Sequence, residues 1–292
     1  MEIFLQQVIN GLSIGAVIAL MALGVTLIFG LTGLVMFAHG ELLVIGGFLA
    51  WFVTIQLSSS FWLGLLFAIV AVGLIGLALE RGVFRFTFDS PINGFIVSLG
   101  LIIVLQHLLV ELSPVGASIV DLPAPITKVF DLGGARIPGT RVLVVGATLV
   151  VVAVMLWVIY RSGHGRALRA SAIDRDTAAL MGIPVRRYIM VVFLVGSLLA
   201  GLGGALMIGL FPIDPFIGGR FVIKAFAVAL AGGLGNPLGA ILAAFGLGLA
   251  EAMGTQYFQP EWSESYAFIV MIIILLVRPR GLLTGLQGPA AR

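Results

Sequence analysis

The chain has 292 residues, of which 60% are hydrophobic and only 10% are charged. A soluble domain carries about 25% charged residues, so this composition excludes a soluble protein and predicts an integral membrane protein. The net charge of +3 favours contact with anionic lipid headgroups and suggests no nucleic-acid partner. The chain contains no cysteine, which excludes disulfides, thiol nucleophiles and thiolate metal sites.

Apolar runs of membrane-spanning length follow one another from the N-terminus, where residues 1–10 lack the basic region and cleavage site of a signal peptide. The runs are 8–30, 42–57, 61–80, 94–111, 141–160, 188–211, 222–233 with 237–256, and 266–278. The strict alternation of β-barrel strands is absent. The sequence therefore predicts an all-α fold, a polytopic transmembrane helical bundle of eight or nine spans forming a single domain over residues 1–292.

Residues 222–256 leave two alternatives open. The stretch AGGLGNPLGA interrupts the apolar pattern, and its glycines and Pro237 are poorly suited to the middle of a helix. Either two spans meet there at a tight turn, or a half-helix re-enters the membrane.

Basic residues predict the orientation, because Lys and Arg near spans are retained in the cytoplasm. With residues 161–187 inside, alternation of the spans places eleven of the sixteen Lys and Arg on the cytoplasmic side and Lys224 among those outside. The N-terminus is then outside and the C-terminus at Arg292 is cytoplasmic. Segment 112–140, rich in proline and glycine, is expected to form an external loop, since backbone without regular pairing is excluded from lipid.

The longest polar stretch is 161–187, with six arginines and two aspartates. Ser171 and Asp174 have the spacing of a capping box. Less polar residues then recur at helical spacing, and Gly182 and Pro184 mark the end of the helix. The pattern predicts a short helix outside the membrane, from Asp174 to Met181. The alternative is a solvated loop whose arginines only determine topology.

Few residues suggest catalysis. There is no phosphate-binding G-x-x-x-x-G-K-[ST] and no H-E-x-x-H, so neither an ATP site nor a zincin-type metal site is expected. Gly11, Ser13 and Gly15 match G-x-S-x-G, which raises an intramembrane serine hydrolase, but they lie in a continuous helical run where small residues favour helix packing. Glu251 is the deepest acidic residue, and it supports the alternative of an ion-coupled secondary transporter.

Four motifs carry a resemblance to a known family. Residues 33–41 read GLVMFAHGE, with Met36 where that family usually has Asn. The remaining three are GRALRA at 165–170 followed by AALMGI at 178–183, GGLGNPLGA at 232–240, and RPRGL at 278–282. In order and spacing they resemble branched-chain amino acid ABC importer permeases of the LivH type along nearly the full chain.

The resemblance implies a multi-pass inner-membrane transport subunit of an ATP-driven importer, not an enzyme, for leucine, isoleucine and valine or for a related amino acid or short amide such as urea. Its implied partners are a second related permease subunit in a heterodimer, two cytosolic ATPases that use the ATP, and an extracytoplasmic solute-binding protein. This chain itself would hold no cofactor.

The resemblance also directs attention to particular residues. The expected ATPase-coupling residues are Arg169, Ala170, Asp174, Ala178, Ala179, Leu180 and Gly182. Irregular backbone at membrane depth is tolerated where it is buried in protein or lines a cavity. On that ground the candidates for the translocation path or gate are His39, Glu41, Gly233 and Asn236.

Overall fold

The computed structural model describes residues 2–88, 90–132, 135–258, 262–278 and 281–283. Its helices in chain order are α1 (Glu2–Thr32), α2 (His39–Trp51), α3 (Phe61–Gly82), α4 (Pro91–Leu112), α5 (Gly139–Arg161), α6 (Gly163–Ile173), α7 (Arg175–Leu180), α8 (Val185–Met207), α9 (Gly218–Gly232), α10 (Pro237–Tyr257) and α11 (Ser263–Val277). A π-helical turn, Phe52–Gln56, continues α2. The predicted all-α bundle is confirmed, and every predicted span falls on one of these helices.

Seven of the helices in the described chain are long and apolar enough to cross a membrane, with α2 counted together with its π-helical turn. The helices α9 and α11 have 15 residues each. At ~1.5 Å per residue, each covers roughly 22 Å of a hydrocarbon core about 30 Å thick. The predicted count of eight or nine spans requires α9, α11 or both to cross the membrane as well, and it stays a prediction.

The core of the bundle is built by α1, α2 and α8, whose apolar windows are mostly buried, whereas α3, α4 and α5 expose most of theirs. Glycines allow this close packing. A Cβ on Gly46 of α2 would lie 2.8 Å from the Cα of Gly201 on α8, and one on Gly15 of α1 would lie 2.9 Å from the Cα of Phe245 on α10. Small residues at such contacts are the usual basis of helix association in membranes.

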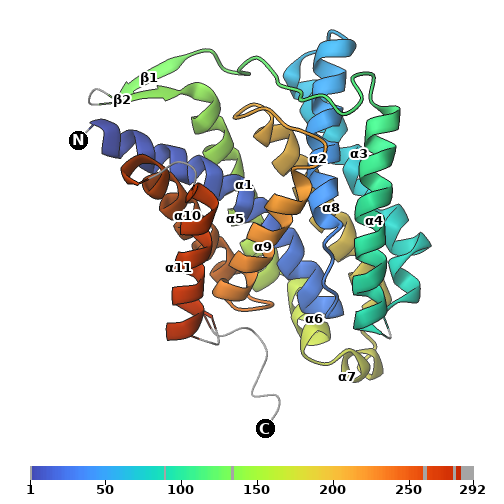
Figure 1. Ribbon diagram of the computed structural model, residues 1–292. Coiled ribbons are helices and arrows are strands. Elements are labelled where there is room, and N and C mark those ends of the chain that lie inside the picture. Colours follow the sequence, from blue (N-terminus) through green and yellow to red (C-terminus); the bar gives the residue numbers. More distant parts are fainter. Residues whose placement is uncertain (1, 89, 133–134, 259–261, 279–280, 284–292) are drawn as a thin grey trace.

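The 112–140 segment lies at one end of the bundle and the α6–α7 segment at the other (Figure 1). Within the former, β1 (Val129–Leu132) pairs antiparallel with β2 (Ala135–Pro138). A single bridge joins Val120 to Ile213, in the loop after α8. The sequence predicted this loop but not its hairpin.

Residues 222–256 form two helices joined by a turn, and the choice between two spans and a re-entrant half-helix stays a prediction. Gly233, at φ +103°, ends α9, and Asn236 begins α10 by accepting hydrogen bonds from the amides of Leu238 and Gly239 at 3.1 and 3.2 Å. Because α9 begins only at Gly218, after an irregular segment, it is shorter than a full span. The predicted cytoplasmic C-terminus at Arg292 lies outside the described residues.

Candidate functional site

The α6–α7 segment is a pair of capped helices rather than one helix in a loop. Ser162 begins α6 by accepting a hydrogen bond from the amide of Gly165 at 2.9 Å. Asp174 begins α7 by accepting bonds from the Thr177 amide at 3.0 Å and the Thr177 hydroxyl at 2.7 Å. The predicted short helix is confirmed. The predicted capping box is wrong, because Ser171 lies inside α6, where its hydroxyl donates to the carbonyl of Ala167.

The hydrogen bonds from Thr177 also hold the pKa of Asp174 below its usual value. The carboxylate therefore stays ionised through the neutral range, and this cap is lost only when the pH falls through the lowered pKa. At its other end α7 closes in a Schellman motif, with the amide of Gly182 bonded to the carbonyl of Ala179 and that of Ile183 to Ala178. Gly182 takes the left-handed φ of +81° that this motif requires.

Two arginines fasten this helical pair to the ends of spanning helices. Arg169 donates to the carbonyl of Ile159 near the end of α5, and its guanidinium lies 5.6 Å from the centre of the Tyr160 ring. The Nε of Arg175 donates to the carbonyl of Leu31 at the end of α1, at 2.7 Å. Both arginines satisfy carbonyls that a helix end leaves open, and both place positive charge at the negative end of a helix dipole. These two hydrogen bonds join α6 to the end of α5 and α7 to the end of α1.

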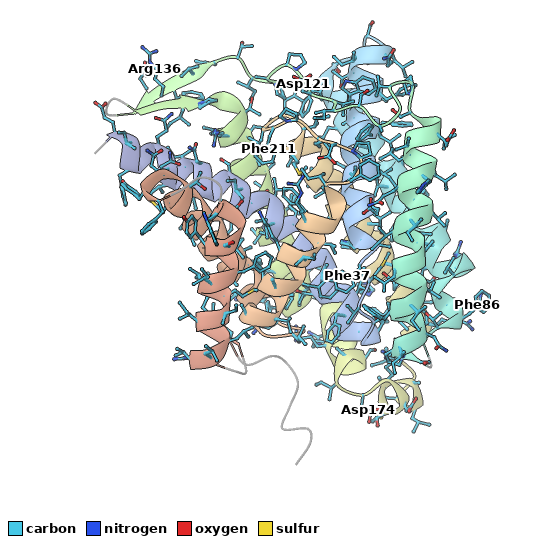
Figure 2. All side chains as sticks on the ribbon, viewed as in Figure 1. Phe37, Phe86, Asp121, Arg136, Asp174 and Phe211 are labelled. Carbon is cyan, nitrogen blue, oxygen red and sulfur yellow. The ribbon has the colours of Figure 1, made fainter. Side chains whose placement is uncertain are left out.

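The C-terminal end of α7 exposes two large apolar side chains. Leu180 is 87% exposed and Met181 is 79% exposed. Figure 2 shows the neighbouring Asp174 at the extreme end of the molecule. Among the predicted coupling residues, Ala178 is buried, Ala170 is half-buried and Ala179 is exposed beside Leu180. These adjacent apolar side chains make the tip of α7 a candidate protein-binding surface.

A second group of polar residues lies deep in the bundle, where α2 and α9 both begin. Gly40 of α2 and Gly218 of α9 touch so closely that neither has space for a Cβ atom. Glu41, in the first turn of α2, is 1% exposed and accepts a hydrogen bond from Nε2 of Gln106 on α4 at 3.1 Å. Three helices therefore meet at this carboxylate.

The structure does not bring the four predicted path residues together. His39 is fully buried on the other side of α2, with its ring against Gly24 of α1. Gly233 and Asn236 lie beyond the opposite end of α9, about 22 Å from its start. Asn236 caps the N-terminus of α10 there. A role for these residues in the path remains a prediction, and Glu41 is the one that lies at the meeting point of three helices.

Two residues of the interior were not anticipated as partners. Gln106 sits 65 positions from Glu41. Lys224, placed outside by the charge count, instead lies inside the bundle on α9, where its Nζ is 2.8 Å from Oε1 of Glu251 on α10. The side chains of Lys224 and Glu251 are 7% and 13% exposed. Glu251 is thus one half of an internal ion pair. Its partner could not be identified from the sequence, because the two residues lie on different helices separated by a turn.

The G-x-S-x-G motif at residues 11–15 contributes to helix packing. The Ser13 hydroxyl donates to the carbonyl of Ile9 at 2.8 Å, within α1. Gly11 and Gly15 lie directly against the backbone of α10. Their small size explains the G-x-S-x-G pattern without catalysis.

Apolar helices of spanning length, with buried charges between them and a capped helical pair at one end, define a polytopic helical membrane protein. Residues 7–275 match the family model described as the branched-chain amino acid transport system permease component. The chain belongs to this family, as its four motifs indicated.

Individual relatives agree with the family assignment. The chain is 33% identical to the high-affinity branched-chain amino acid transport system permease protein LivH of Salmonella typhimurium, covering 96% of this chain and 95% of LivH. It is also 33% identical to the corresponding permease protein BraD of Pseudomonas aeruginosa, with the same coverage. Among solved structures, PsaBC from Streptococcus pneumoniae in complex with Fab has a TM-score of 0.51 and 17% identity, and covers 94% of this chain and 90% of that chain. This last likeness concerns the fold alone.

Proposed function

We propose that this chain is a membrane-spanning permease subunit of an ATP-driven importer of branched-chain amino acids. Membership of the permease family carries the proposal. The chain has no phosphate-binding loop of its own, so ATP must act through a partner subunit. The same family membership supports a soluble binding protein as the partner that delivers the substrate.

The α6–α7 pair is the surface that would receive the ATPase. Its exposed Leu180 and Met181 offer an apolar contact, and Arg169 and Arg175 connect it to α5 and α1. An ATPase that binds this surface differently in two nucleotide states biases the bundle between two conformations, as any coupled equilibrium requires. The predicted cytoplasmic orientation of 161–187 places this surface on the side where ATP is available.

The complete assembly would contain a second permease subunit, as a heterodimer, and two ATPases. The segment 112–140, with its β1–β2 hairpin, lies at the end of the bundle opposite α7 and is suited to receive the binding protein (Figure 1). This arrangement puts the N-terminus of the chain outside and its C-terminus in the cytoplasm.

Reconstitution of the four kinds of subunit in proteoliposomes tests the proposal. Leucine uptake is expected to require ATP on the side of the ATPases. Met181→Asp should weaken ATPase binding at least about tenfold, the effect of losing about 1.4 kcal/mol, whereas Met181→Leu, which keeps the apolar surface, should bind normally. Leucine uptake driven by an ion gradient without any ATPase would instead establish a secondary transporter.

A further inference from the structure

Among the side chains that the structure describes, three glutamates hold their carboxylates inside the bundle: Glu41, Glu80 and Glu251. Glu251 pairs with Lys224, and Glu80 lies within electrostatic range of Arg81, Arg85 and Arg186. A carboxylate buried in a membrane protein is costly unless it has such a partner.

Glu41 differs from the other two. Among the described residues its hydrogen-bond partner is the neutral amide of Gln106, and the charge that acts on it is that of Asp214, which has the same sign. The positive ends of α2 and α9, each about half an elementary charge, compensate only part of its charge. Its second oxygen, Oε2, is buried without a hydrogen-bond partner in the described chain. The site therefore has an open acceptor that suits a cation.

An apolar cavity begins one helical turn further along the same two helices. Its volume is about 420 Å³, and its lining includes Ile45 and Leu49 of α2 and Leu105 and Leu109 of α4. Ile45 follows Glu41 by four residues and Leu109 follows Gln106 by three, so these side chains share a helix face with the polar pair. Small-molecule sites usually have volumes of about 300–1,000 Å³ and combine an apolar lining with a few polar groups.

We propose that Glu41 contacts the ammonium group of the amino acid during its passage, while the aliphatic side chain of the amino acid occupies the cavity beside Ile45 and Leu109. The ammonium supplies the positive charge and the N–H donors that Glu41 Oε2 lacks. Gly218 allows α9 to lie directly against this carboxylate, because a Cβ there would lie 2.7 Å from Glu41 Oε1. This inference rests on the proposed function and adds the chemistry by which the membrane subunit itself recognises an α-amino acid.

The test uses the reconstituted importer with its binding protein. Glu41→Gln keeps the shape but removes the charge, and leucine uptake is expected to fall at least tenfold. ATP hydrolysis stimulated by the loaded binding protein should remain, because the α6–α7 surface is unchanged. Glu111→Gln is the matched control, since it makes the same chemical change at an exposed position on α4 and should leave uptake unchanged. Normal leucine uptake by the Glu41→Gln importer overturns the proposal.

A second variant covers the case in which Glu41→Gln does not assemble. Leu109→Trp fills the cavity and is expected to reduce uptake of leucine several-fold more than uptake of the smaller valine. An equal loss for both substrates, together with a lipid acyl chain found bound in the purified complex, would show that the cavity belongs to lipid and would overturn the inference. If the unmodified complex shows no ATP-driven uptake, the proposed function itself has failed.

Discussion

Gly182 is the residue on which the end of α7 depends. Its φ of +81° lies in the left-handed region, which costs an L-residue with a side chain about 1–2 kcal/mol. Gly182→Ala should therefore loosen the Schellman motif and displace Leu180 and Met181. We expect the affinity of the ATPase for the permease to fall about five- to thirtyfold, the factor that one or two kcal/mol represents, as measured by titration in detergent.

Gly163→Ala provides the control for that measurement. Gly163 also lies in the α6–α7 segment, but its φ is not in the left-handed region and a Cβ there would approach only Arg166, at 3.9 Å. This variant should bind the ATPase normally, and both variants should keep the melting temperature of the membrane bundle. Unchanged ATPase affinity in Gly182→Ala would mean that the end of α7 takes no part in docking.

At the scale of single residues, the sequence predicts what is determined locally. Gly182 can be predicted as a helix end because a Schellman motif spans only six residues. Asp174 can be predicted as a helix start because an N-cap also involves only neighbouring residues. The partner of Glu41 cannot be predicted from the sequence, since Gln106 is 65 positions away on another span. Ser171 was misassigned because the local pattern does not reveal that α6 already encloses it.

At the scale of elements, the ion pair between α9 and α10 joins a short helix to a long one. Lys224 and Glu251 are both nearly buried, and removal of one partner leaves the other charge unpaired at a cost of about 3–5 kcal/mol. Glu251→Gln should therefore lower the melting temperature of the purified protein clearly. The double variant Lys224→Met, Glu251→Leu removes both charges and should melt higher than Glu251→Gln.

The same variants discriminate between two roles of Glu251. If it serves only to hold α9 against α10, the double variant should retain ATP-driven leucine uptake within a few-fold of the unmodified protein. If it carries protons, both variants should lose uptake regardless of their stability. Recovery of stability without recovery of uptake would contradict the structural role assigned to the pair.

The elements themselves follow from the sequence to different degrees. The spans are predictable because about 20 apolar residues are needed to cross a bilayer. The helix α6 was missed because its arginines resemble those of a solvated loop, although one of them, Arg169, anchors it to α5. The β1–β2 hairpin was missed because the prolines and glycines around it hide its short strands.

At the scale of the whole molecule, the sequence does not show which spans are central. Its long helices are apolar on all sides, so the direction of the apolar face gives little guidance. The glycines decide the arrangement: Gly46 on Gly201 and Gly15 on Phe245 bring α2 and α10 against α8 and α1. Such pairings join residues far apart in the chain, and only the assembled structure identifies them.

Orientation in the membrane is the whole-molecule property that remains a prediction, and the lack of cysteine makes it directly testable. Ser118 is exposed in the 112–140 segment and Thr177 is exposed on α7, at opposite ends of the bundle. In spheroplasts, a membrane-impermeant maleimide should label Ser118→Cys at once and Thr177→Cys only after permeabilisation. The unmodified chain provides the unlabelled control. The reverse pattern would place the arginine-rich segment outside, where no ATPase could reach it, and would remove the physical basis for coupling through α6 and α7.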